Sequence, residues 1–272
     1  MNAKGSDRRF AAVVLSGDRS GSDPLVVASG RGCKALVEID GTPMILRVLE
    51  ALGQSSTVES ITICGPSRES IATEERLQRM IAEQRIAWQP PQTTPSTSAW
   101  QALDATPPQT PVLLTTADHP LLRAEIVEHF CREALATGAD AVVGLAPYAL
   151  VREIFPGMRK TVLRFRDDEY CGCNLFAFLT PAGRQMAERW RAVEAERKSP
   201  LKVMKMLGWL SVLRYRFGWL SLAGAERALS RRMGLRLAVV RMPFGDAAVD
   251  VDSPSDHELV QERLRARRHA AG

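Results

Sequence analysis

A six-residue apolar run followed by a small-residue loop and a lysine constrains this 272-residue chain more than any other feature. The run, Phe10 to Leu15, has the length and composition of a buried strand. A loop of small and charged residues follows from Ser16 to Cys33 and ends at Lys34. Glycines in such a loop let backbone N–H groups approach phosphates, and a lysine adds a compact positive charge. The stretch therefore predicts a strand–loop unit that binds phosphate.

The residues after Lys34 sharpen this prediction. A short apolar run over 35–39 leads into the turn Asp40–Pro43, and a helix is predicted from Met44. Arg19 and Arg31 are alternative phosphate-binding cations beside Lys34, and together these three are the candidate catalytic residues. The candidate nucleotide contacts in the loop are Leu15, Ser16, Gly17 and Asp18.

Apolar runs alternate with helical stretches along the rest of the chain. Strands are predicted at 10–15, 58–64, 86–88, 112–116, 139–145, 160–166, 171–179 and 235–242. Helices are predicted at 43–53, 67–84, 97–104, 120–137, 181–197 and 254–268, with two or three short helices over 200–233 that break near Gly208, Gly218 and Gly224. This alternation predicts the α/β class, with one mostly parallel twisted sheet flanked by helices. We expect a nucleotide-binding half (1–146) and an acceptor-binding half (147–272) that share the sheet.

Two acidic segments lie where their side chains could bind a metal ion. Asp118 follows the strand at 112–116, and Asp250 and Asp252 precede the last helix. Ligands collect at the carboxyl ends of parallel strands, and Mg²⁺ prefers carboxylate oxygens. Alternation along a strand would point Asp250 and Asp252 to the same face. In the plainer interpretation Asp118 caps a helix that begins at Pro120, and Asp252 or Ser253 caps the last helix.

In this order, these residues resemble the GT-A-like nucleotidyltransferases, in particular the MobA-like NTP transferase family. That superfamily includes molybdenum cofactor guanylyltransferases and sugar- or polyol-phosphate cytidylyltransferases. The resemblance lies in residues 14–21, 34–45 and the Asp118-His-Pro120 segment. The chain differs from the family pattern because Ser16-Gly17-Asp18 replaces its Ala-Gly-Gly core and the loop is longer, which indicates a divergent subfamily.

The resemblance implies a Rossmann-like GT-A fold and a Mg²⁺ ion held by Asp118 and Asp252, with Asp250 as the next candidate. It also implies that Ser96 and Ser98 contact the base and ribose of a nucleotide. Ordinary helix capping explains these two serines equally well.

A second element implied by the resemblance lies in the acceptor half. Gly172 and Asn174 match a Gly-x-Asn element with which related enzymes contact the acceptor. The alternative is a polar residue that closes a strand. The Cys171-Gly-Cys173 pair invites a metal interpretation, but no second cysteine pair or histidine cluster accompanies it, so buried thiols are favoured.

Positive charge is concentrated in one helical insert, near 198–234. Eleven Lys and Arg residues and one acidic residue, Glu226, lie between Arg197 and Arg241, in a chain whose net charge is +5. Within it, residues 200–220 mix cations with aromatic side chains, which is typical of a helix lying on an anionic membrane surface. The favoured alternative is a helical subdomain that packs on the sheet and leaves its basic face in solvent. We expect no nucleic-acid partner, since no nucleic-acid-binding motif is present.

Composition points to an enzyme of the cytoplasm. The five cysteines are an odd number, which favours reduced thiols. No stretch approaches the length of a membrane span, so we expect a cytoplasmic protein, with a peripheral position at the inner membrane surface as the alternative.

The sequence thus predicts a Mg²⁺-dependent nucleotidyltransferase. It would transfer a nucleoside monophosphate from a triphosphate to a phosphorylated small molecule or lipid head group and release pyrophosphate. One alternative is a GT-A glycosyltransferase that uses a nucleotide sugar. Another is a non-catalytic protein that binds nucleotide or membrane. The base, the acceptor and the oligomeric state stay open.

Overall fold

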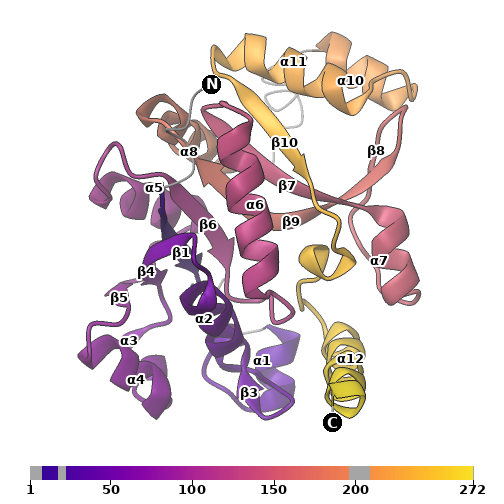
Figure 1. Ribbon diagram of the computed structural model, residues 1–272. Coiled ribbons are helices and arrows are strands. Elements are labelled where there is room, and N and C mark those ends of the chain that lie inside the picture. Colours follow the sequence, from indigo (N-terminus) through magenta and orange to yellow (C-terminus); the bar gives the residue numbers. More distant parts are fainter. Residues whose placement is uncertain (1–7, 18–22, 196–208, 272) are drawn as a thin grey trace.

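An eight-stranded sheet forms the centre of the structure (Figure 1). The structure is a computed structural model that describes residues 8–17, 23–195 and 209–271. The strands of the sheet are β1 (Phe10–Leu15), β4 (Val58–Cys64), β5 (Ala87–Gln89), β6 (Val112–Thr116), β7 (Ala141–Pro147), β8 (Leu163–Arg164), β9 (Glu169–Phe178) and β10 (Leu237–Arg241). A separate small hairpin pairs β2 (Glu38–Ile39) with β3 (Thr42–Pro43).

The sheet is mixed but mostly parallel. Its order is β10-β7-β9-β6-β1-β4-β5, with β8 beside β9. β1 runs parallel to β4 and β6, and β10 runs parallel to β7. β9 is antiparallel to both β6 and β7, so it joins the two parallel parts. The predicted fold class is confirmed, and residues from both predicted halves contribute to this one sheet.

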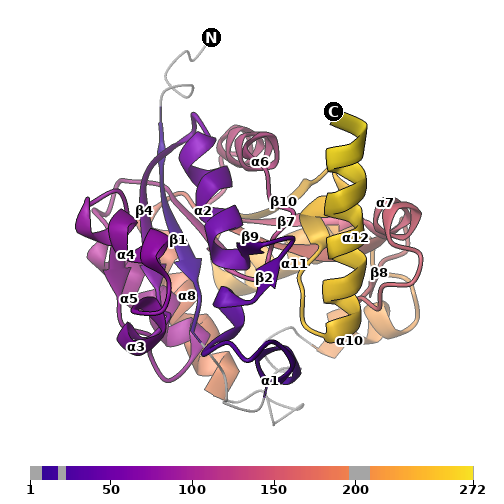
Figure 2. The same cartoon turned by 90° about the horizontal axis from the view of Figure 1, so that it is seen from below.

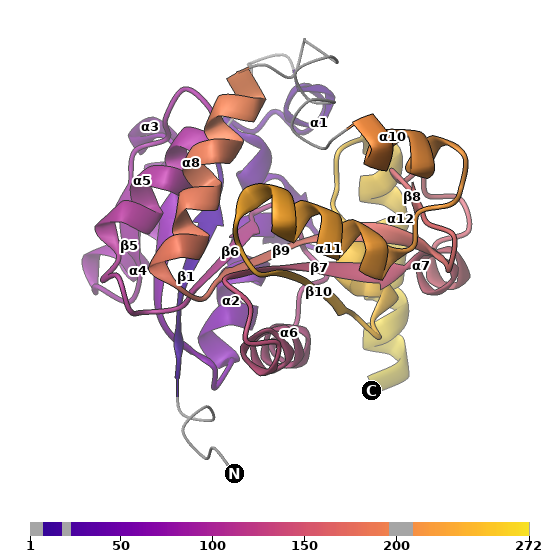
Figure 3. The same cartoon turned by 90° about the horizontal axis from the view of Figure 1, so that it is seen from above.

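Helices cover both faces of the sheet (Figures 1 and 3). The helices are α1 (Pro24–Ser29), α2 (Met44–Gln54), α3 (Arg68–Ile71), α4 (Glu75–Ala82), α5 (Pro95–Ala105), α6 (Ala124–Ala136), α7 (Tyr148–Ile154), α8 (Pro181–Ala195), α10 (Trp209–Arg216), α11 (Leu222–Met233) and α12 (Pro254–Ala271). Two short 3-10 helices are η1 (Lys34–Leu36) and η2 (Gly245–Ala248). α2 and α6 contact each other on one face, and α5 and α8 contact each other on the other.

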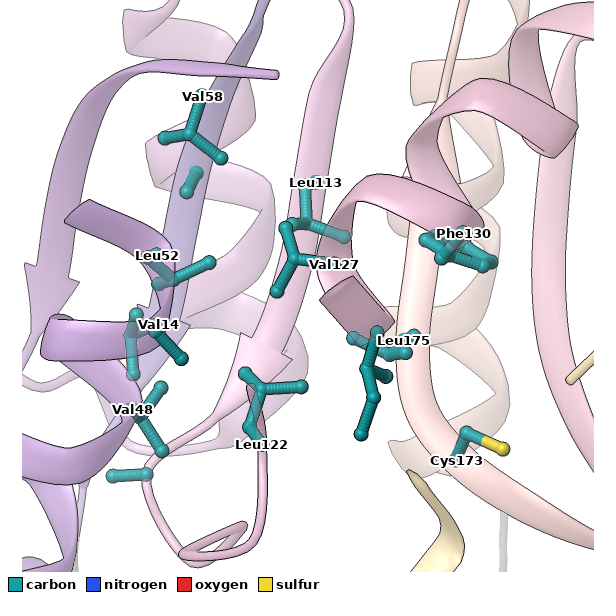
Figure 4. Packing of buried hydrophobic residues seen from close by; sticks show 14 of the residues in the cluster. Val14, Val48, Leu52, Val58, Leu113, Leu122, Val127, Phe130, Cys173 and Leu175 are labelled. Atoms are coloured by element: carbon teal, nitrogen blue, oxygen red, sulfur yellow. The ribbon is translucent and has the colours of Figure 1, made fainter. Parts of the chain in front are cut away.

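Strand alternation explains why β1 can be covered on both sides. Phe10, Ala12 and Val14 pack into the large core with α2 and α6, whereas Val13 packs into the core with α5 and α8. Figure 4 shows the first of these cores, in which Val14 lies near Val48. A continuous apolar run is what a strand covered on both faces requires.

Three strands in the predicted nucleotide-binding half match the predictions to the residue: Phe10–Leu15, Val58–Cys64 and Val112–Thr116. The helix predicted at 67–84 is wrong as a single element, because it forms the separate helices α3 and α4. Ser67 does cap the first of them, accepting a hydrogen bond from the Ser70 N–H at 3.2 Å. The loop 16–33 also contains a helix that was not predicted, α1.

The predicted and observed elements differ more in residues 147–272. The strand predicted at 160–166 shortens to β8, which pairs antiparallel with β9. The predicted break at Gly224 is wrong, because this residue lies inside α11. The predicted break at Gly208 lies outside the described residues. No strand forms at 250–252, so the strand alternation assumed for Asp250 and Asp252 is wrong.

The basic insert packs on the sheet through α11. Leu222 is buried with Tyr170 and Leu145 from the sheet, and Met233 at the other end of the helix is also buried. This agrees with the interpretation of the insert as a packed helical subdomain. All five cysteines are buried and free, Cys171 and Cys173 among them. None of the helices in the described parts of the chain is long and apolar enough to cross a membrane.

Candidate active site

The candidate site is a cavity of about 300 Å³ at the carboxyl ends of β1 and β6. Figure 2 shows this edge of the molecule, where α1 lies beside α12. The residues that line the cavity are Leu15, Gly17, Asp23, Lys34, Cys64, Gln92, Thr93, Pro95, Ser98, Thr116, Asp118, Asn174, Asp250 and Asp252. Residues from both predicted halves therefore meet in one site.

Lys34 joins the two predicted acidic sites. Its ammonium donates to Asp118 Oδ2 at 2.7 Å and also forms an ion pair with Asp252. The backbone reinforces this meeting, because the Val251 N–H donates to the Asp118 carbonyl at 3.0 Å. Segments 84 and 218 residues away from Lys34 are thus brought to one point.

The charges of this triad stabilise one another. Burial would lower the pKa of Lys34, but the two carboxylates outweigh burial and raise that pKa. Burial would likewise raise the pKa of Asp118, yet the Lys34 ammonium holds it below its ordinary value. Lys34 is therefore a cation at neutral pH, and Asp118 is an anion, although the side chains are only 18% and 23% exposed.

Asp118 is not a helix cap. The helix predicted to start at Pro120 begins instead at Ala124, with Arg123 as its N-cap residue. A short loop separates Asp118 from this helix, so capping does not use its carboxylate. One of its oxygens, Oδ1, is buried without a hydrogen-bond partner. The interpretation of Asp118 as a cap is therefore wrong.

Asp252 is also free of the capping role. Ser253 caps α12 by accepting a hydrogen bond from the Asp256 N–H at 3.2 Å. The Asp256 carboxylate in turn accepts from the Asp252 N–H at 3.3 Å. The backbone of Asp252 thus belongs to the cap of the helix, while its carboxylate reaches Lys34 in the cavity.

Asp250 belongs to a neighbouring ion pair that sequence reasoning missed. Its carboxylate pairs with the ammonium of Lys160 and accepts from the amide Nδ2 of Asn174 at 3.3 Å. Asn174 lies in β9 with a φ of +49°, a left-handed conformation that asparagine tolerates better than most residues. The Lys160 side chain is 9% exposed. No motif around Lys160 indicates this role, because the pairing spans 90 residues.

The predicted phosphate loop is partly described. Ser16 donates through its hydroxyl to the Cys64 carbonyl at 3.1 Å, which holds the start of the loop against β4. Asp18 and Arg19 lie outside the described residues. Arg31 pairs with Glu38 and does not line the cavity. Asp23 lines the cavity and accepts from the Leu25 N–H at 2.9 Å as the N-cap of α1.

The two candidate serines differ in position. Thr94, not either serine, caps α5 by accepting from the Thr97 N–H at 3.2 Å. Ser98 lines the cavity, and its hydroxyl accepts from the Gln92 N–H at 3.0 Å. Ser96 is buried beside Thr94 and is not among the lining residues.

The two candidate acceptor contacts also differ. Asn174 lines the cavity, whereas Gly172 does not. Gly172 pairs with Leu145 in the sheet, and a side chain added there would meet nothing within 4 Å.

The carboxylate oxygens of the cavity suit a divalent cation that is also bound by a substrate. Asp118 and Asp252 converge on one positive charge, and Asp118 Oδ1 is an unused buried oxygen. Among the described residues, no three His, Cys, Asp or Glu side chains come together as a metal cage. Mg²⁺ does not need such a cage, because it commonly uses one or two carboxylates together with water and substrate phosphates.

Comparison with known proteins places the chain in a family. A model of the MobA-like NTP transferase domain matches residues 12–167. A segment of 131 residues is 34% identical to the bifunctional protein GlmU of Azorhizobium caulinodans, covering 45% of this chain and 29% of that protein. The chain therefore spans less than a third of the length of that relative.

Solved structures share the fold over nearly the whole chain. A hypothetical transferase from Thermus thermophilus has a TM-score of 0.76 and 28% identity, covering 92% of this chain and 99% of that one. A 4-diphosphocytidyl-2C-methyl-D-erythritol synthase from Anaerococcus prevotii has a TM-score of 0.58 and 12% identity over 97% of this chain and 100% of its own. A CMP:2-keto-3-deoxy-manno-octonic acid synthetase complexed with CTP has a TM-score of 0.55 and 13% identity, covering 95% and 99%.

Proposed function

We propose that this chain, which belongs to the MobA-like NTP transferase family, is a Mg²⁺-dependent enzyme that transfers a nucleoside monophosphate from a triphosphate to a phosphorylated acceptor. One observation carries the proposal. A protonated lysine bridges two carboxylates in a cavity at the carboxyl edge of the sheet. Such a group of charges suits a substrate that brings its own negative charge and a divalent cation.

Lys34 would bind the triphosphate. Its ammonium stays protonated, so it can neutralise phosphate charge without any change in protonation. Gly17 lines the cavity and has no side chain, so it would let the loop backbone come close to the same phosphates. A Cβ added there would also lie 3.3 Å from Pro91. The hydroxyl of Ser98 lies on the wall of the cavity and is a candidate contact for the nucleoside.

Asp118 and Asp252 would hold the Mg²⁺, which when bound supplies positive charge to the triphosphate. Lys34 would then exchange carboxylate contacts for phosphate contacts. Asp118 can offer Oδ1 without breaking any other hydrogen bond. Because the Lys34 ammonium keeps the pKa of Asp118 low against the opposing effect of burial, Asp118 is already ionised and needs no deprotonation to act as a ligand.

The reaction needs little acid–base help from the protein. An ionised oxygen of the acceptor phosphate would form a bond to the α-phosphorus, and the bond from that phosphorus to the bridging oxygen would break. Pyrophosphate then leaves with the electron pair of the broken bond. The protein contributes by aligning two anions and neutralising their charge.

The acceptor side would be formed by Asn174 and the Lys160–Asp250 pair. Asn174 projects from β9 into the cavity, and Lys160 provides a second cation close to it. A phosphorylated acceptor, whether a small molecule or a lipid head group, suits a wall of this charge. We also propose that the enzyme works in the cytoplasm.

The test is pyrophosphate release from each of the four triphosphates, with Mg²⁺ and a panel of sugar, polyol and lipid head-group phosphates. CTP is the first choice, because one similar structure is a 4-diphosphocytidyl-2C-methyl-D-erythritol synthase and another is a synthetase complexed with CTP. We expect acceptor-dependent release that Asp118→Asn abolishes. Asp104→Asn, which removes an exposed carboxylate from α5, is the matched control and should keep full activity.

Two results would contradict the proposal. Transfer of a sugar from a nucleotide sugar, without pyrophosphate release from any triphosphate, would favour a glycosyltransferase. Tight triphosphate binding without turnover by any panel member would favour a non-catalytic binding protein.

A further inference from the structure

The segment from Leu213 to Trp219, which we call the aromatic loop, carries an unusual set of exposed side chains. It consists of the last turn of α10 and the turn that leads from this helix towards α11, at one corner of the molecule (Figure 3). Trp219 is 66% exposed and Phe217 57%, with Leu213 and Tyr215 also exposed. Among the described residues, the one other large hydrophobic side chain with such exposure is Val27. Contiguous exposed apolar surface of this kind marks a binding surface.

The aromatic loop is held in one conformation. The Trp219 N–H donates to the Arg214 carbonyl at 2.8 Å, and the Phe217 N–H donates to the Leu213 carbonyl at 3.0 Å. Gly218 takes a φ of +70°, which closes the turn between the two aromatic residues. Their rings stack with centroids 5.4 Å apart. The loop therefore presents a pair of rings without first having to fold.

Positive charge lies directly beside these rings. A cavity of about 370 Å³ is lined by Trp219 and by Arg166, Arg214 and Arg227. In the described part of the chain, none of these three guanidinium groups has a carboxylate partner. Asp167, the acidic residue next to Arg166 in the chain, accepts from the Leu222 N–H at 2.9 Å and pairs with Arg241 at 3.8 Å.

We propose that the aromatic loop binds the surface of an anionic lipid bilayer, with a lipid phosphate entering the arginine-lined cavity. Trp219 and Phe217 would enter the interfacial region, where an indole ring is favoured and the apolar face of a bound segment is buried. These three guanidinium groups, which pair with no carboxylate among the described residues, would meet the negative lipid head groups, which attract nearby cations. A second copy of the chain fits less well, because a symmetric contact would set these arginines against each other.

The test is co-sedimentation of the full chain with vesicles of phosphatidylcholine alone or of equal parts phosphatidylcholine and phosphatidylglycerol. Three cations near an anionic surface predict binding to the mixed vesicles on the order of 100-fold tighter. High salt should weaken this binding. Equal affinity for both vesicle types, or none for either, would overturn the proposal.

Variants locate the surface. Phe217→Ser with Trp219→Ser should abolish vesicle binding, whereas Val27→Ser, which removes an exposed apolar side chain elsewhere, should not. Arg214→Gln with Arg227→Gln should remove the preference for anionic vesicles. Arg76→Gln with Arg79→Gln, two exposed cations of α4, is the matched control and should leave the preference intact. Equal effects of test and control pairs would contradict the assigned surface.

Two further experiments distinguish a lipid surface from other ligands of the aromatic loop. Excess inorganic phosphate should not displace the protein from the vesicles, because the rings also contribute to binding. Full displacement would show that the cavity binds free phosphate and not a lipid surface. The protein should not self-associate in the absence of lipid. If it does, and if the Phe217→Ser, Trp219→Ser variant does not, the aromatic loop is an interface between copies of the chain. Pyrophosphate release with soluble substrates should be unchanged in these variants, so the two proposals fail separately.

Discussion

Cations cluster around the cavity at the carboxyl edge of the sheet and also at the aromatic loop, but in the described parts of the chain only those around the cavity are buried and paired with carboxylates. Lys34 and Lys160 are each largely buried and paired with aspartates. Arg166, Arg214 and Arg227 are exposed and have no carboxylate partner among the described residues. Buried cations need partners because desolvation is expensive, whereas exposed ones are solvated by water. The lysines that pair with aspartates thus belong to a buried site, and the arginines without a described carboxylate partner belong to the outer surface.

The largest expected effect is on catalysis in the cavity. Asp118→Asn keeps the size of the side chain but removes the negative charge that would hold Mg²⁺. We expect kcat for pyrophosphate release to fall on the order of 1,000-fold, since loss of one preorganised electrostatic group has about this effect. Steady-state kinetics would measure it, with circular dichroism as the check on folding. Near-full activity in this variant would show that the cavity is not the catalytic site.

The second effect is on stability. Lys34→Met leaves Asp118 largely buried without its cation, so we expect a loss of about 3 kcal/mol in the free energy of unfolding. The double variant Lys34→Met, Asp118→Asn should recover part of this loss, because the buried carboxylate is gone and Asp252, the other partner of Lys34, is 67% exposed to solvent. Denaturant unfolding of the four proteins gives the coupling. Additive losses would mean that the two charges do not depend on each other.

A third prediction concerns pH and the ion pair between Arg236 and Asp140. Hydrogen bonds from the Arg236 guanidinium lower the pKa of Asp140 from 3.8 to about 2. Because the folded-state pKa is lowered, this contact stabilises the fold above the unfolded value and is lost as the pH falls towards 2. Asp140→Asn should therefore lower the melting temperature at pH 7 more than at pH 2. An equal change at both pH values would contradict the prediction.

The smallest effect is expected in the aromatic loop. Arg227→Gln removes one of three neighbouring positive charges that have no described carboxylate partner. We expect the free energy of unfolding to change by less than about 0.5 kcal/mol, in the stabilising direction if repulsion matters. Thermal melts in low and high salt would measure it. A loss as large as that of Lys34→Met would remove the distinction between the two regions.

Local sequence patterns predicted the central parallel strands well. β1, β4 and β6 match to the residue, because continuous apolar runs bounded by polar or turn residues determine buried strands locally. Prediction was poorer where a helix start depends on the surrounding loop. Pro120 is a favourable first residue for a helix, yet α6 starts at Ala124 after a loop that places Asp118 in the cavity.

The sequence by itself determined the α/β class, the strand that delivers Asp118, and the candidate roles of Lys34, Asp118 and Asp252. Only the tertiary structure decided that Lys34 touches both carboxylates, that Lys160 pairs with Asp250, and that Phe217 and Trp219 stay exposed. The reason is physical. Strands and turns follow from interactions between near neighbours in the chain, whereas ion pairs across 84 to 218 residues and the exposure of a ring depend on how the whole sheet brings distant segments together.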